Sequence, residues 1–160
     1  MKRLFLLVVA VLFVAAGYAQ SVKFTVPDVD VKLKRCIGSG NSAYIDLVMT
    51  NWTNKEIQAH CTDRDHLNNY GVIYTAAYDD EGNVYKFKSA LSVTVSGEDV
   101  AFGSFYLPRE VPVKVRVYIK NLSEYAREFK LLKMSFRGVS PVEPYGISLL
   151  EVRGIPITRQ

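Results

Sequence analysis

The chain has 160 residues and a formal net charge of +4, with 20 Lys and Arg against 16 Asp and Glu. This length is enough for one domain with a substantial hydrophobic core. The small excess of positive charge does not argue for a nucleic-acid partner.

The first residues have the pattern of a secretory signal peptide. A basic start and an apolar run over residues 4–16 precede small residues, and we predict cleavage after Ala19. The run is shorter than the roughly 20 residues that span a bilayer, so an uncleaved anchor is the less favoured alternative. We therefore expect a signal peptide over 1–19 and a single exported domain over 20–160, with no membrane span in the mature chain. Cleavage removes two basic residues, which leaves 18 against 16 acidic ones and a net charge of +2.

Past this segment, apolar and polar residues alternate almost throughout, which is typical of half-buried β-strands. The alternation predicts strands over residues 29–37, 43–51, 55–62, 72–78, 84–88, 90–96, 100–107, 111–120, 129–138 and, as a C-terminal extension, 146–156. Ile45, Leu47 and Met49 are expected to face the core, as is Val111, on the face opposite the outward Pro112. One short helical turn is expected at residues 121–128, with Asn121 as its N-cap and Glu124 in a capping box. Many short strands and almost no helix predict an all-β fold, an immunoglobulin-like antiparallel β-sandwich. A small β-barrel is the alternative.

An acidic stretch between two strand-like runs is the first candidate site: Asp79, Asp80, Glu81, Gly82 and Asn83. Carboxylates bind Ca²⁺, but consecutive side chains of an extended chain point to opposite faces, and the closing Glu of a calcium loop is missing. Asp residues followed by a Gly of positive φ are what a bulged hairpin requires. We therefore predict a hairpin turn whose acids face solvent, with Tyr78 and Tyr85 paired across its strands.

A second polar cluster contains several types of zinc ligand: His60, Cys61, Asp63, Asp65 and His66. Zinc sites normally add a second paired motif from elsewhere, and these are the only two histidines of the chain. We therefore expect a polar loop here, with no metal and no other cofactor. The sequence also contains no motif of a known enzyme class, so we predict no catalysis.

The two cysteines, Cys36 and Cys61, leave two alternatives open. In an exported protein they can form a disulfide, and otherwise they pack as small buried apolar residues. The sequence does not show whether their Cβ atoms face each other.

The outward positions of several predicted strands are basic, at Lys32, Lys34, Lys114, Arg116, Lys120, Lys133 and Arg137. If these strands are neighbours, the residues form a stripe that can hold an acidic glycan, a lipid headgroup or an anionic protein patch. A solvated sheet face has the same pattern, since lysines also protect strands from aggregation. The candidate ligand-binding residues are Trp52, expected to be exposed in a turn, with Lys114, Arg116, Lys120 and Arg137.

Three sequence features resemble one group of proteins. They are a strand that closes on Asn51, an Asp-x-x-Gly-Asn hairpin that ends at Asn83, and a late Pro-Val-Lys-Val strand from Pro112 that a short turn follows. Over residues 29–138 the chain resembles small exported immunoglobulin-like domains of uncharacterised function from Bacteroidetes-type Gram-negative bacteria. The resemblance implies an architecture but carries over no catalytic or ligand residues.

The sequence thus predicts a non-catalytic binding or structural module of the periplasm or cell surface. Its partner would be an envelope protein or a glycan of unknown identity. One expected mode is strand pairing through a sheet edge or through the tail strand at 146–156. The other is glycan binding by Trp52 and the basic stripe.

Overall fold

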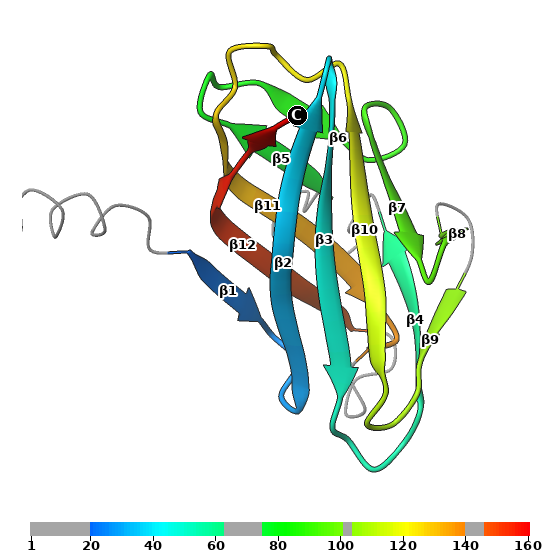
Figure 1. Ribbon diagram of the computed structural model, residues 1–160. Coiled ribbons are helices and arrows are strands. Elements are labelled where there is room, and N and C mark those ends of the chain that lie inside the picture. Colours follow the sequence, from blue (N-terminus) through cyan, green and yellow to red (C-terminus); the bar gives the residue numbers. More distant parts are fainter. Residues whose placement is uncertain (1–19, 63–74, 101–103, 140–145) are drawn as a thin grey trace, which may run out of the picture.

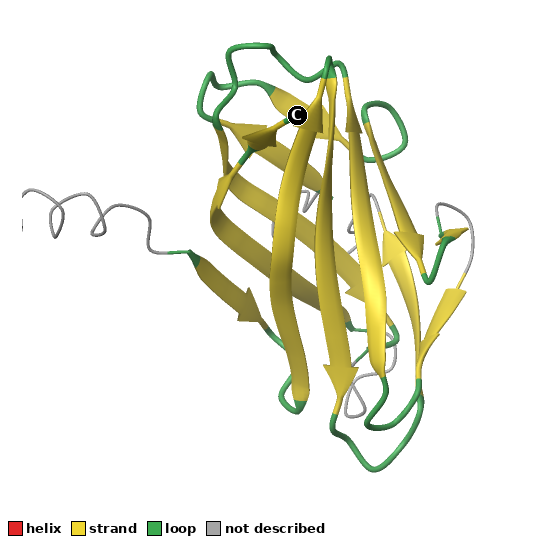
Figure 2. Cartoon of the chain, in the orientation of Figure 1, coloured by secondary structure: helices red, strands yellow, loops and turns green. Residues whose placement is uncertain are grey.

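The computed structural model describes residues 20–62, 75–100, 104–139 and 146–160, which form an all-β fold (Figures 1 and 2). The strands in these ranges are β1 (Ser21–Phe24), β2 (Val29–Ser39), β3 (Ser42–Asn51), β4 (Ile57–Thr62), β5 (Ala76–Asp79), β6 (Val84–Lys86), β7 (Leu91–Val95), β8 (Glu98–Asp99), β9 (Ser104–Leu107), β10 (Pro112–Lys120), β11 (Glu128–Arg137), β12 (Ile147–Pro156) and β13 (Thr158–Arg159). No helix that could cross a membrane occurs in the part of the chain that the structure describes.

Two sheets stack as a β-sandwich, as the alternating pattern predicted. Sheet A has the order β1-β12-β11-β4-β9, and β5 also pairs with β11 and carries β6 on its other side. Sheet B has the order β13-β2-β3-β10-β7-β8. Figure 1 shows β2, β3 and β10 as one layer in front of β11 and β12. The named strand pairs are antiparallel except β13 with β2, which is parallel.

The core lies between the sheets and consists of the alternate apolar residues of each strand. The largest fully buried side chains on the long strands are Ile45, Leu47, Met49 and Ile119 from sheet B, with Phe129, Leu132, Met134, Phe136, Leu150 and Ile155 from sheet A. Phe136 meets the rings of Phe24 and Phe105 edge to face, with centroids 6.0 Å apart in each case. Because such packing buries large apolar areas, it supplies most of the stability of the sandwich.

The helical turn predicted at residues 121–128 is wrong. Asn121 has a φ of 56°, in the left-handed region, so it does not have the extended backbone of an N-cap. A single turn follows, in which the Ala126 amide donates to the Ser123 carbonyl at 3.2 Å. Arg159 from β13 donates to the carbonyls of Ser123 and Ala126, and these bonds satisfy the loop without a helix.

The tail strand is not free to pair with a partner chain. β12 lies inside sheet A, with β1 on one side and β11 on the other. Both of its edges are therefore used within the chain, and strand addition through this segment is excluded.

Candidate functional site

The acidic stretch forms the predicted hairpin, with Gly82 at a φ of +86°, but Asp79 does not face solvent. Because β5 extends through Asp79, the two-residue alternation turns this side chain inward beside Ala77, and only 3% of the residue is exposed. Its carboxylate accepts hydrogen bonds from the Glu81 and Asn83 amides, the Asn83 side chain and the Tyr85 hydroxyl, at 2.7–3.0 Å.

Asp79 is therefore a structural carboxylate. Burial alone would raise its pKa, but the hydrogen bonds from Asn83, Tyr85 and Glu81 prevail, so the pKa lies below its ordinary value. The predicted Tyr78–Tyr85 pair is wrong, since the register places Tyr85 opposite Ala77.

The predicted polar cluster is only partly described. His60 and Cys61 are consecutive residues of β4, so they point to opposite faces: His60 is exposed and Cys61 is buried in the core. Asp63, Asp65 and His66 lie outside the described residues. Within the described ranges, no group of three His, Cys, Asp or Glu side chains is placed to hold a metal ion.

The two cysteines form no disulfide in the structure. Cys36 and Cys61 are buried thiols on strands of different sheets. Burial raises the pKa of Cys36 to about 12, although the nearby charge of Arg159 opposes this shift. A thiol with this pKa is almost fully protonated at neutral pH and is a poor nucleophile.

The structure divides the predicted basic stripe between the two sheets. Arg137 and Lys133 lie on β11 in sheet A, and Lys114, Arg116 and Lys120 lie on β10 in sheet B. A single stripe through all five residues is therefore wrong, because β10 and β11 follow each other in sequence but cross from one layer to the other. Arg137 is half-buried, and its Nε has no hydrogen-bond partner in the described part of the chain.

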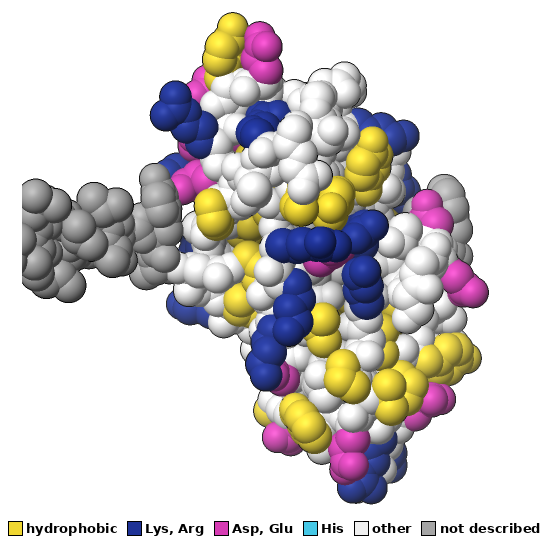
Figure 3. Space-filling model, in the orientation of Figure 1, with side chains coloured by type: hydrophobic (Ala, Val, Ile, Leu, Met, Phe, Trp, Pro, Cys, Tyr) yellow, Lys and Arg dark blue, Asp and Glu magenta, His cyan; other side chains and the backbone are white. Residues whose placement is uncertain are grey.

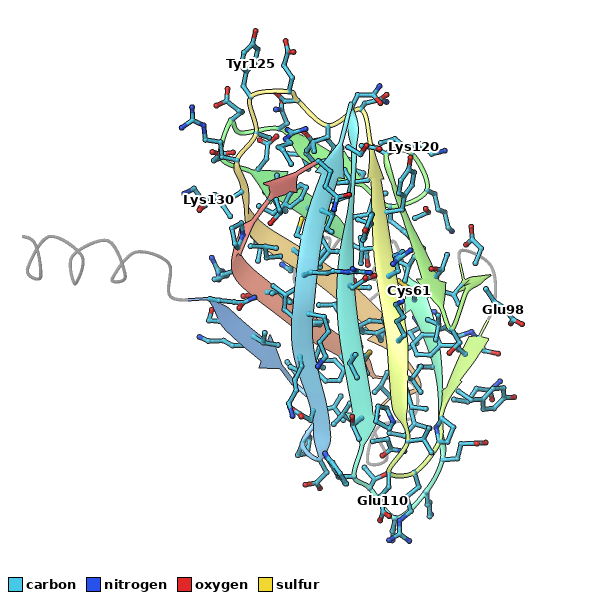
Figure 4. All side chains as sticks on the ribbon, viewed as in Figure 1. Cys61, Glu98, Glu110, Lys120, Tyr125 and Lys130 are labelled. Carbon is cyan, nitrogen blue, oxygen red and sulfur yellow. The ribbon has the colours of Figure 1, made fainter. Side chains whose placement is uncertain are left out.

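The cations of sheet B gather on the outer face of its three longest strands. We call this surface the basic face; it is formed by outward side chains of β2, β3 and β10, among them Lys32, Lys34, Arg35, Tyr44, Asp46, Val48, Lys114, Arg116, Tyr118 and Lys120. Asp30 lies on the same face and forms an ion pair with Lys32 at 3.1 Å. The register places Lys32, Val48 and Lys114 in one row across the sheet, and Arg35, Asp46 and Arg116 in the next. Figure 3 shows the Lys and Arg side chains gathered across the middle of this face, with hydrophobic side chains beside them. Figure 4 locates Lys120 near the upper end of β10.

At the centre of the basic face, two arginines converge on one buried carboxylate. The side chain of Asp46 is only 4% exposed. Its carboxylate accepts hydrogen bonds from Arg35 Nε at 2.8 Å and from Arg116 Nε at 2.6 Å. Arg116 also donates from Nη2 at 3.0 Å and lies over the ring of Tyr44, 4.3 Å from its centroid. The hydrogen bond from Arg116 is the main cause that lowers the pKa of Asp46. Burial acts against it, and Arg35 adds to the lowering.

The carboxylate of Asp46 accepts hydrogen bonds from only some of the N–H groups of the two arginines beside it. Arg35 spends Nε on the carboxylate, and its Nη1 and Nη2 have no hydrogen-bond partner among the described residues. A hollow of about 290 Å³ lies alongside, between Lys34 and Lys114, with Val48 and Pro112 in its lining. No acidic side chain in the described ranges forms an ion pair with Lys34 or Lys114. The hollow is therefore apolar in part, and its charged lining consists of Lys34, Arg35, Lys114 and the carboxylate of Asp46, on which the charge of Lys114 also acts.

The basic face leads to an exposed tryptophan at the end of β3. Trp52 is 57% exposed, as the sequence predicted, and its amide donates to the Asp28 carbonyl at 2.7 Å. The preceding Asn51 is fully buried and bonds Lys55, Thr53 and Leu107, which fixes the turn. The bond from the Trp52 amide to Asp28 continues the register in which Val29 lies opposite Asn51, so the alternation of β3 extends one residue past Asn51 and places Trp52 on the outer side of sheet B. Val111, expected to face the core, is 49% exposed and adjoins Pro112 of the hollow.

A wider depression of about 840 Å³ lies elsewhere, lined by Asp80, Glu81, Tyr125, Arg127 and Arg159 among others. Two of its charged side chains are already engaged with the backbone. Arg159 donates to three backbone carbonyls, and Asp80 accepts from the amides of Arg127 and Glu128. Because its lining mixes acidic and basic side chains, this depression is a weaker candidate than the basic face.

The sequence predicted part of this site and missed its centre. Trp52, Lys114, Arg116 and Lys120 lie on or beside one surface, and Arg137 does not. Arg35 and Asp46 were not predicted. Asp46 stands at an outward strand position where an acid is unremarkable, and Arg35 reaches that row only because the chain bulges between Leu33 and Arg35.

Comparison with models of known protein families and with curated proteins found no match for this chain. The resemblance to exported immunoglobulin-like domains therefore remains a prediction, and the function is argued from the site alone.

Proposed function

We propose that this protein is an exported, non-catalytic binding module of the periplasm or cell surface, and that the basic face binds an anionic partner. The signal-like pattern of residues 1–19 supports export. The surplus of positive charge on one flat face supports binding, because such a surface raises the local concentration of anions.

The observation that carries this proposal is the Arg35–Asp46–Arg116 cluster. A buried carboxylate fixes both guanidinium groups, so a ligand need not order them when it binds. Asp46 neutralises only part of the charge, and the Nη atoms of Arg35, with Lys34 and Lys114, remain for an anion.

Strand pairing, the other expected mode, is disfavoured at the described edge that adjoins this face. β13 pairs with β2 only at Ile37 and Gly38. The rest of that edge carries a bulge and the exposed Lys32 and Lys34, and bulges and lysines both discourage a further strand.

The test compares two double variants that lose the same charge. Lys34→Gln/Lys114→Gln alters the hollow, and Lys23→Gln/Lys133→Gln alters sheet A. Calorimetric titration of residues 20–160 with dextran sulfate should show affinity that falls with added salt. The affinity for dextran sulfate should be at least about tenfold weaker for Lys34→Gln/Lys114→Gln, since each lost charge-assisted contact is worth about 1.5 kcal/mol or more. The affinity of Lys23→Gln/Lys133→Gln should stay close to that of the wild type. Equal losses in both variants would contradict the proposal.

A further inference from the structure

Trp52 and the cations of the basic face lie along one line. Along β3 the outward positions run from Asp46 through Val48 and Thr50, and Trp52 continues this series beyond the strand end. Since each pair of residues advances a strand by about 6.7 Å, Trp52 and the Asp46 row are about 20 Å apart. Between them lie Val48 and Pro112, with Lys114 beside the hollow.

We propose that this strip binds an acidic polysaccharide, a chain of sugar rings that carries carboxylate or sulfate groups. The inference rests on the proposed function and names its ligand class. Apolar ring faces would lie against Trp52, Val48 and Pro112, and the anionic groups would meet Lys114, Lys34 and the Nη atoms of Arg35. The strip has an aromatic end and a cationic middle, which matches a polymer whose rings are apolar on their faces and charged at their edges.

Three observations favour a glycan over an acidic peptide or an anionic membrane. Peptides that bind β-sheets commonly use backbone hydrogen bonds at an edge, and here the backbone of β3 is paired on both sides, with β2 and β10. A planar bilayer cannot enter the hollow between Lys34 and Lys114. The buried Asn51 fixes the turn that carries Trp52, so the backbone presents this exposed aromatic side chain at a defined position, as stacking on a sugar requires.

The assay uses the fluorescence of Trp52, the single tryptophan of the chain. Residues 20–160 are titrated with polygalacturonate, dextran sulfate, neutral dextran, poly-L-glutamate and vesicles of phosphatidylglycerol. We expect saturable changes in Trp52 emission with polygalacturonate or dextran sulfate. The polymer that binds with the higher affinity shows whether the site prefers carboxylate or sulfate groups. Neutral dextran, poly-L-glutamate and the vesicles should leave the emission unchanged.

A matched pair of variants tests the aromatic contact by calorimetry. Trp52→Ala should weaken binding of the responding polysaccharide about tenfold or more. Tyr125→Ala, which removes a 69% exposed ring from the loop between β10 and β11, should leave binding unchanged.

The outcomes separate this inference from the proposed function. If polyanions bind through Lys34 and Lys114 but leave Trp52 fluorescence unchanged, the basic face is a binding surface and the glycan inference is wrong. An equal response to poly-L-glutamate or to vesicles also overturns the glycan inference. Failure of every polyanion to bind overturns both.

Discussion

Asp79 offers the sharpest test of how the hairpin between β5 and β6 is stabilised. Replacement by Ala removes a 3% exposed carboxylate and deprives the buried Tyr85 hydroxyl of the acceptor that it reaches at 2.7 Å. An unsatisfied buried donor costs about 1–3 kcal/mol. The three remaining donors, from Glu81 and Asn83, lie nearer the surface and can bond water, so each adds less.

We expect a total loss of about 3 kcal/mol in the free energy of unfolding. For a domain of this size that loss lowers Tm by about 10 °C. Urea titration and calorimetry of residues 20–160 measure both quantities. The control is Glu81→Ala, an exposed neighbour with no side-chain hydrogen bond in the described part of the chain, which should change stability by less than about 0.5 kcal/mol.

The pH dependence gives an independent check on the same carboxylate. Because the pKa of Asp79 is lower in the folded chain than its ordinary value of about 3.9, its stabilisation is complete above that value and is lost as the pH falls through the folded pKa. The difference in stability between the wild type and Asp79→Asn should therefore be constant near neutral pH and shrink below about pH 4. A stability change below about 0.5 kcal/mol for Asp79→Ala, or a difference that grows in acid, would show that the Asp79 carboxylate does not stabilise the hairpin.

Three further predictions concern other parts of the fold. Asp46→Asn should lower stability by about 1 kcal/mol at pH 7, since its arginine partners are partly exposed. Because the pKa of Asp46 is lowered in the folded chain, this loss should shrink as the pH falls below about 4, as unfolding at several pH values would show. Cys36, whose pKa is raised to about 12, should resist iodoacetamide at pH 8 in the folded protein and react with it in urea. Mass spectrometry of the peptide that contains Cys36 measures this labelling, and rapid labelling of the folded chain would contradict the burial of the thiol. Gly138→Ala should lower the free energy of unfolding, measured by urea titration, by roughly 2 kcal/mol more than Gly82→Ala does. Both glycines have a positive φ, but only a Cβ at position 138 would meet the Gln58 carbonyl oxygen, at 2.5 Å. Equal losses of stability in the two variants would argue against that close approach.

Sequence alternation was enough to predict which strand residues form the core. Ile45, Leu47 and Met49 were expected inside and are fully buried, because a half-buried strand must place every second residue on one face. The same rule failed at Val111, which precedes the first residue of β10 and is not held by its ladder. Alternation therefore predicts faces within strands and loses its meaning at their ends.

Contacts between distant residues could not be predicted in this way. Asp46 meets Arg35 and Arg116, which are 11 and 70 positions away, and only the register of β2, β3 and β10 brings them into one row. Likewise Arg116 and Arg137 occupy similar outward positions in sequence, but their strands belong to different sheets. One sequence carries no signal for which of two sheets a strand joins, so the basic residues were wrongly grouped.

Mapping by NMR can show whether an anionic ligand binds to the basic face. Backbone amide shifts of ¹⁵N-labelled residues 20–160 are followed while a short anionic oligosaccharide is added. We expect the largest shift changes in β2, β3 and β10, around Arg35, Val48 and Lys114, and changes that extend to the Trp52 indole. Largest changes around Lys133 and Arg137 on sheet A, or small changes spread evenly over all exposed lysines, would contradict it.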